Sequence, residues 1–215
     1  MAAGKGKPAK EEVACRMPKE TRWVHGNAIV AETLHPALEQ VTSDSGTLLT
    51  YTDIVGLRQG RGVTYQGLNQ RGNFNWFHAV IPTPTVVDGR PTRLERIFVL
   101  YDTPEPRSNP VSVREIHVWD GPDFIQAFDV KNGNAPHIGK PFVMGESQFE
   151  IDEARKREVS FGIGISIRVI FGEDPSQSGG LPTTVVFTGA GAEFSWLDPP
   201  VRRLWRGIFD RFFGG

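Results

Sequence analysis

The stretch NFNWFHAVI, residues 73–81, decides the fold class because its side chains alternate between two faces of an extended chain. One face carries Phe74, Trp76, His78 and Val80. The other carries Asn75, Phe77, Ala79 and Ile81. Both faces are bulky, which predicts a central strand of a packed sandwich, and we expect Trp76 to lie in its core. Pro82 and Pro84 end the strand, because proline cannot donate a backbone hydrogen bond.

The same period of two recurs in segments bounded by Gly, Pro, Asn or Asp. They are residues 22–31, 47–55, 92–103, 111–121, 124–130, 158–172 and 183–196. The turn-rich residues 172–182 predict that the last two segments pair with each other. With about nine strands and no alternation of strands with helices, we expect an all-β, antiparallel β-sandwich of jelly-roll or Greek-key type. A closed barrel is the alternative.

The composition indicates one globular domain, because 215 residues with 39% hydrophobic side chains can bury a core. A net charge of -1 gives no field that would attract nucleic acid, so no nucleic-acid partner is expected. The single cysteine, Cys15, excludes an intramolecular disulfide and favours a reducing compartment. The Lys-rich start is not followed by an apolar stretch, so we expect a cytoplasmic protein.

Two terminal segments differ from the strand-rich body, residues 21–197. Residues 1–20 predict a flexible basic arm. Residues 198–215 predict a short amphipathic helix whose apolar positions recur at three- and four-residue spacing. These positions are Leu204, Trp205, Ile208, Phe209, Phe212 and Phe213. Such a short helix needs a receiving surface, which is its own sandwich, a partner protein or neighbouring subunit, or a membrane interface.

Three histidines, His25, His78 and His117, lie inside predicted strands. A cupin-like metal centre needs two or three histidines and a carboxylate that converge, usually with two ligands close together on one strand. Each histidine here stands alone, so we favour structural roles and expect no metal or cofactor. A metal-dependent enzyme with these three ligands is the alternative. The patterns of a nucleophile elbow and a phosphate loop are missing, so no catalytic residue is assigned.

Residues 56–73, GLRQGRGVTYQGLNQRGN, form the best candidate for a binding loop, because hydrogen-bonding side chains alternate with glycines there. The candidate ligand-binding residues are Arg58, Gln59, Arg61, Tyr65, Gln66, Asn69 and Arg71. Together with nearby aromatic rings they would suit a carbohydrate, whose C–H groups stack on such rings. The rings that could stack on sugars are Trp23, Tyr51, Tyr65, Trp76, Trp119 and Trp196. For Trp76 and Trp119 we favour a position in the core.

Three segments resemble an uncharacterised bacterial family of unknown function. They are the Trp-x-His-Gly-Asn opening at residues 23–27, the Asn-Trp-Phe-His-x-x-Ile-Pro-x-Pro strand at 75–84 and the His-Val-Trp-Asp-Gly turn at 117–121. The resemblance spans roughly residues 22–195. It implies a compact β-sandwich of bacterial origin and supplies no activity.

These observations rank three functions. The first is a non-catalytic binding or assembly module that self-associates, with the C-terminal aromatic helix docking on a partner or a neighbouring subunit. The second is a lectin-like domain that binds glycans through residues 58–71. The third is the cupin-like metal enzyme.

Overall fold

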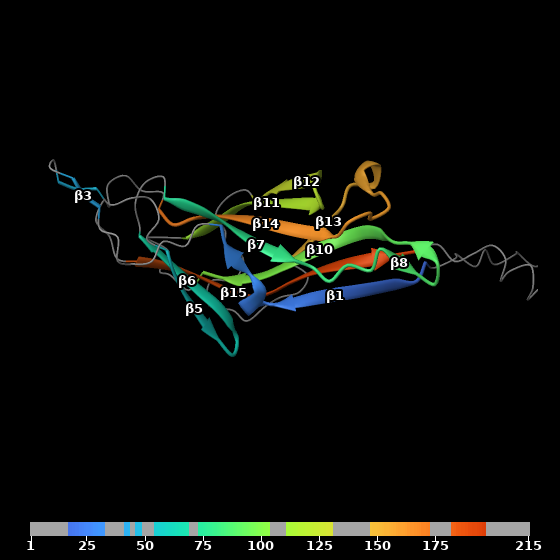
Figure 1. Ribbon diagram of the computed structural model, residues 1–215, viewed down its shortest axis with the longest axis horizontal. Helices are drawn as coiled ribbons and strands as arrows, with labels where there is room; N and C mark the ends of the chain where they lie inside the picture. The colour runs from blue at the N-terminus through green and yellow to red at the C-terminus, as the bar shows by residue number, and fades with distance from the viewer. Residues whose placement is uncertain are drawn as a thin grey trace, which may run out of the picture. The chain divides into compact units, whose positions relative to one another are not determined.

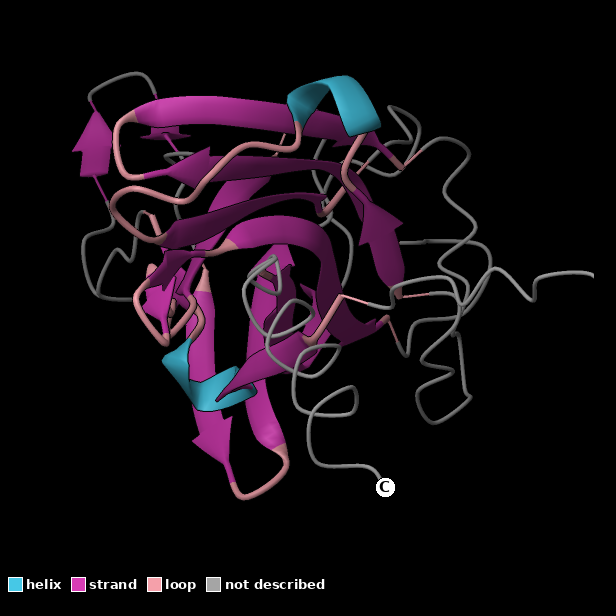
Figure 2. Ribbon diagram, turned by 90° about the vertical axis from the view of Figure 1, so that its right-hand side faces the viewer, coloured by secondary structure: helices cyan, strands magenta, loops and turns pink. Residues whose placement is uncertain are grey.

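Antiparallel strands make up nearly all the regular structure of the computed structural model, which confirms the all-β prediction. The structure describes residues 17–32, 41–43, 46–48, 54–68, 73–103, 111–130, 147–172 and 182–196. The helices in these ranges are two single 3-10 turns, η1 (Gly26–Ala28) and η3 (Glu153–Arg155), cyan in Figure 2. None of the described helices is long and apolar enough to cross a membrane. The predicted C-terminal helix, residues 198–215, lies outside the described residues.

The first sheet, sheet B, has five antiparallel strands. Their order is β12 (Asp123–Asp129), β11 (Ser112–Asp120), β14 (Ile163–Ile170), β7 (Phe74–Val80) and β2 (Val30–Ala31). The central strand β14 alternates between buried branched residues and half-buried residues, of which Gly164, Ser166 and Arg168 are small or polar. Its buried row points to the core and consists of Ile163, Ile165, Ile167 and Val169.

The second sheet, sheet A, is built around the long strand β15 (Pro182–Ser195). One edge of β15 pairs with β10 (Arg93–Asp102), which pairs in turn with β13 (Gln148–Glu150). The other edge is shared end to end by two strands, β1 (Lys19–His25) along residues 189–195 and β6 (Gly62–Leu68) along residues 182–187. Strand β5 (Val55–Gln59) pairs with β6 at the outer edge of sheet A. Two short ladders are separate from the two sheets: β3 (Val41–Ser43) with β4 (Gly46–Leu48), and β8 (Val86–Val87) with β9 (Arg90–Pro91).

The two sheets lie one above the other and enclose a single apolar core (Figure 1). Phe77 of sheet B is fully buried between them, with its ring centroid 4.6 Å from that of Tyr65 and 5.2 Å from that of Phe187, both in sheet A. The Tyr65 hydroxyl donates to the carbonyl of Ile29 at 2.8 Å, so this buried polar group is satisfied. The fold is therefore a β-sandwich in the broad sense, held by contacts between distant parts of the sequence.

The predicted pairing of the two long C-terminal strands is wrong. β14 pairs with β11 and β7 in sheet B, whereas β15 pairs with β10, β1 and β6 in sheet A. Both strands bury a full row of side chains, so they face each other across the core, and the chain changes sheet between them. A turn-rich connection indicates a reversal of direction, but it does not fix the sheet to which the next strand belongs.

The prediction of one continuous strand over residues 22–31 is also wrong, because the chain leaves sheet A after His25 and enters sheet B at Val30. The change occurs at η1, where Gly26 lies against the backbone of β15. A Cβ atom on Gly26 would lie 2.0 Å from the carbonyl oxygen of Phe187. Only glycine permits this approach, so Gly26 is where β1 stops following its neighbour.

We predict that Gly26→Ala lowers the free energy of unfolding by about 3 kcal/mol, the upper end of the usual cost of overpacking, because the obstacle is a backbone atom. Gly164→Ala is the matched control, since its Cβ would meet nothing nearer than the Trp119 Cβ at 3.9 Å. We expect the control to change stability by less than about 0.5 kcal/mol. Urea unfolding of both variants measures the difference, and equal midpoints would contradict the assignment.

Candidate functional site

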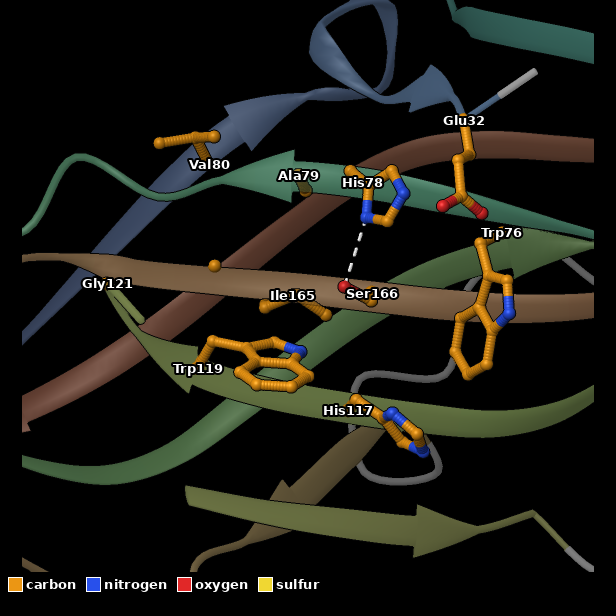
Figure 3. Close-up of a pocket in the computed structure, with 11 residues that line it drawn as sticks. Glu32, Trp76, His78, Ala79, Val80, His117, Trp119, Gly121, Ile165 and Ser166 are labelled. Atoms are coloured by element: carbon orange, nitrogen blue, oxygen red, sulfur yellow. Dashed lines mark hydrogen bonds between the residues drawn. The ribbon is translucent and has the colours of Figure 1, made fainter. Parts of the chain in front are cut away.

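The outer face of sheet B carries an open groove of about 480 Å³. Its lining comes from β7, β14 and β11, together with Glu32 after β2 and Gly121 after β11 (Figure 3). This face lies on the side of sheet B that points away from the core. Phe77 and the isoleucines of β14 point from the same strands into the core. The groove is therefore a property of the sheet surface rather than of a loop.

The groove exists because the central strand of the sheet carries small side chains between two strands that carry large ones. The floor is Gly164 and Ser166 of β14. Register places Val80 and His78 beside them on β7, and Trp119 and His117 beside them on β11. Neighbouring strands are about 4.8 Å apart, so the larger side chains rise as two walls over the floor.

Aromatic rings form a continuous strip that crosses this face from β7 to β11 and β12. The Trp76 and His117 centroids are 4.7 Å apart, and the His117 and Phe124 centroids are 5.6 Å apart. Phe124 in turn lies 5.1 Å from Trp119 in an edge-to-face arrangement. Such contacts fix the ring orientations, so the two indoles present formed surfaces before any ligand arrives.

Glu115 holds the strip in place from beside the groove. Its carboxylate accepts a hydrogen bond from Arg168 at 2.7 Å and lies 3.4 Å from Nε2 of His117. The Arg168 guanidinium also lies 4.6 Å from the centre of the Phe74 ring, a cation–π contact. Glu115 therefore orients the His117 ring, against which Trp76 packs.

His78 and Ser166 meet across neighbouring strands, with His78 Nδ1 3.0 Å from the Ser166 hydroxyl (Figure 3). A serine next to an imidazole is the beginning of a nucleophilic site, but catalysis also needs donors aimed at a developing oxyanion. β14 is paired on both edges, so its backbone N–H groups near Ser166 are committed to the sheet ladder. The geometry instead offers a hydroxyl and an imidazole as hydrogen-bonding partners for a bound molecule.

The end of the groove is fixed by Asp120, which is only 1% exposed. Its carboxylate accepts hydrogen bonds from the backbone N–H groups of Ser160, Phe161 and Gly162 at 2.8, 2.8 and 2.9 Å. Burial alone raises the pKa of Asp120, but these three donors and the charge of Arg157 hold the pKa below its usual range. These three hydrogen bonds, the Asp120 clamp, join the turn between β11 and β12 to residues 160–162, which precede β14.

The turn itself needs glycine at position 121. Gly121 has a φ of 57°, and a Cβ there would lie 2.7 Å from the Cβ of Phe161. Phe161 is 66% exposed and Val80 is 77% exposed, and both lie beside residues that line this end of the groove. This end of the groove is therefore bordered by two exposed apolar side chains.

The residues predicted to bind a ligand do not form a loop, because residues 55–68 fold as the hairpin β5–β6, which projects from sheet A (Figures 1 and 2). Arg58, Gln59 and Arg61 are exposed near its tip, and Gln66 is exposed further along β6. Tyr65 is 2% exposed and belongs to the core, so it cannot contact a ligand on the surface. Asn69 and Arg71 lie outside the described residues, as do Leu204, Trp205, Ile208, Phe209, Phe212 and Phe213.

The three strand histidines separate into a pair and a single residue. His78 and His117 line the same groove, whereas His25 caps η1 by accepting the Asn27 N–H at 3.3 Å. Among the described residues, no group of three His, Cys, Asp or Glu side chains could hold a metal ion. The structure therefore does not bring together the ligand set His25, His78 and His117.

Trp76 and Trp119 are not core residues, contrary to our expectation. Both are half-buried on the outer face of sheet B. The strand that contains Trp76 is bulky on both faces, so its period of two could not show which face points inward. A signal was present in residues 163–168, IGISIR, where isoleucine alternates with small or polar residues and so marks the outer face of the neighbouring strand.

We predict that Asp120 contributes to stability in a pH-dependent way. Its pKa is lowered in the folded protein, so its contribution is complete above the ordinary value of 3.8 and is lost as the pH falls below it. Asp120→Asn should lower the free energy of unfolding at neutral pH by about 1–3 kcal/mol, because an NH2 group replaces one carboxylate oxygen and at least one backbone N–H group loses its acceptor.

The variant should also have a shallower loss of stability in acid than the wild type, which is measured by urea unfolding as a function of pH. Glu158→Gln is the control, since it removes an exposed carboxylate that takes no part in these hydrogen bonds. Identical acid profiles for the wild type and Asp120→Asn would contradict the clamp.

No protein-family model matches this chain, and no match was found among curated proteins or among solved structures. The resemblance carried by the three sequence motifs therefore stays a prediction. The function has to be argued from the groove.

Proposed function

We propose that this protein is a non-catalytic binding module and that the groove on sheet B binds carbohydrate. The observation that carries the proposal is the row of Trp76, His117, Phe124 and Trp119 beside a floor of Gly164 and Ser166. Sugar rings have flat faces of C–H groups that stack on indoles, and their edges are rows of hydroxyl groups. An open groove with aromatic sides and polar groups at its floor suits both.

The spacing of the two indoles favours an oligosaccharide over a single sugar. Trp76 aligns with Arg168 of β14 and Trp119 aligns with Gly164, four positions away on the same strand. Since the two tryptophans also lie two strands apart, their backbone positions are separated by roughly 16 Å. The His117 ring lies between the two indoles, 4.7 Å from Trp76 and 6.5 Å from Trp119, so a sugar stacked on one indole leaves the other for a neighbouring sugar.

The polar groups at the floor would recognise hydroxyl groups. The Ser166 hydroxyl can donate and accept, and His78 and His117 each have a second ring nitrogen besides the one that contacts Ser166 or Glu115. The proposed jelly-roll or Greek-key connectivity supports the same function by analogy, since lectin domains occur among jelly rolls. The site differs from the one that the sequence suggested, which was the hairpin containing Arg58.

We predict that Trp76→Ala and Trp119→Ala each weaken glycan binding at least about tenfold, because an aromatic anchor at a binding surface contributes about 1–2 kcal/mol or more. A glycan array with the wild-type protein would identify the ligand, and titration calorimetry would then measure the variants. Leu57→Ala is the control, since Leu57 is exposed on sheet A, away from the groove.

A second variant tests the groove without removing an aromatic ring. Gly164→Leu fills the floor, and the free space around the position predicts that the sheet tolerates it. We expect binding to be lost while the unfolding midpoint stays close to that of the wild type. A wild-type protein that binds no glycan on a broad array would contradict the proposed function.

We also propose, from the sequence pattern of residues 201–213, that the C-terminal segment docks on a partner or a neighbouring subunit. Deleting Val201–Gly215 should lower the mass measured in solution by light scattering and leave glycan binding unchanged. The control variant is Arg58→Ala in the hairpin β5–β6, which should leave the mass unchanged. If the full-length and truncated proteins are both monomers, self-association through this segment is wrong.

A further inference from the structure

The rim of the groove carries a carboxylate whose position is fixed by the backbone. Glu32 follows the short edge strand β2, and its N–H donates to the carbonyl of Trp76 at 2.8 Å. The pairing of Val30 with His78 holds the preceding residues against β7. Figure 3 shows the Glu32 carboxylate directed to the space between the His78 imidazole and the Trp76 indole. The carboxylate therefore faces a ligand that stacks on Trp76.

Glu32 differs from the other two carboxylates near the groove. Glu115 is paired with Arg168 and His117, and Asp120 accepts three backbone N–H groups. The Glu32 carboxylate makes no hydrogen bond or ion pair with another described residue. Within the part of the chain that the structure describes, no side chain lining the groove neutralises its negative charge.

The other side chains of the described lining bring no fixed positive charge against this negative charge, and Arg168, which aligns with Trp76 on β14, is paired with Glu115. Among the described residues that line the groove there is no lysine or arginine, and Glu32 is the one acidic side chain. The face of an indole also attracts cations, because its π electrons give it a negative surface. A cation above Trp76 would be attracted by both the ring and the carboxylate, whereas an anion would be repelled by both.

We infer that the groove selects glycans whose sugars carry protonated amino groups, such as oligomers of glucosamine, over neutral and acidic glycans. This inference rests on the proposed carbohydrate function and names the class of sugar. The Glu32 carboxylate would form the ion pair, Trp76 would supply the cation–π contact, and the remaining aromatic strip would stack on neighbouring sugars.

The test compares two ligands of the same backbone and linkage, an oligomer of glucosamine and an oligomer of N-acetylglucosamine of equal length. Affinities are measured at a mildly acidic pH, which keeps the amino groups of the glucosamine oligomer protonated, for the wild type, for Glu32→Gln and for Glu158→Gln. Glu158 is an exposed carboxylate that does not line the groove, so its variant makes the same change in net charge elsewhere. A galacturonic acid oligomer completes the set as the acidic ligand.

We expect the wild type to bind the glucosamine oligomer most tightly. Glu32→Gln should weaken that binding about fivefold, the upper range for a solvent-exposed ion pair, and leave the affinity for the N-acetylated oligomer unchanged. Added salt should reduce the wild-type preference for the charged oligomer, because the attraction is screened. Glu158→Gln should behave as the wild type.

Other outcomes overturn the inference in ways that can be told apart. If the N-acetylated or the acidic oligomer binds as tightly as the charged one, or if Glu32→Gln weakens all ligands equally, the selection for amino sugars is wrong while carbohydrate binding stands. If none of the three oligomers binds but the array identifies another neutral glycan, the selection is again wrong. If no glycan binds at all, the selection and the proposed function fail together.

Discussion

The burial of Phe77 between the sheets is the contact on which the functional face depends. Its ring packs against Tyr65 and Phe187 of sheet A, which commits one face of β7 to the core. Since side chains alternate along a strand, Trp76 and His78 must then point to solvent. A shift of one residue would bury the indole and the imidazole and expose Phe77. The same parity applies to β14 and β11, so the core dictates the composition of the groove.

The groove needs no specialised loop, because it follows from side-chain size on three adjacent strands. Glycine and serine on β14 lie between larger residues on β7 and β11. The inner face of the same strands is buried, with Phe77 and Ala79 on β7 and branched aliphatic residues on β14 and β11, which gives the surface a rigid support. Loops are the usual carriers of binding sites, but a sheet face can hold its side chains with less freedom to move.

The sequence predicted the strands better than their partners. The period of two located β7, β10, β11 and β12 within a few residues, because alternation is a local property. Pairing depends on contacts that are distant in the sequence, which is why β14 and β15 were wrongly joined and why the break at Gly26 was missed. The positions of Trp76 and Trp119 on the outer face were missed for a similar reason: a strand with large residues on both faces does not reveal which face is buried until its partners are known.

The pairing of β1 with β15 has a consequence for how the chain acquires its structure. Lys19 bonds to Glu193, a separation of 174 residues, and β10 lies on the opposite edge of β15. Sheet A therefore cannot be completed during synthesis until residues 182–195 have left the ribosome. Until then β1, β6 and β10 lack their shared neighbour and expose unpaired edges. Folding dominated by such long-range pairings is slow, so the interval before β15 emerges is when the chain is most open to aggregation and to chaperones.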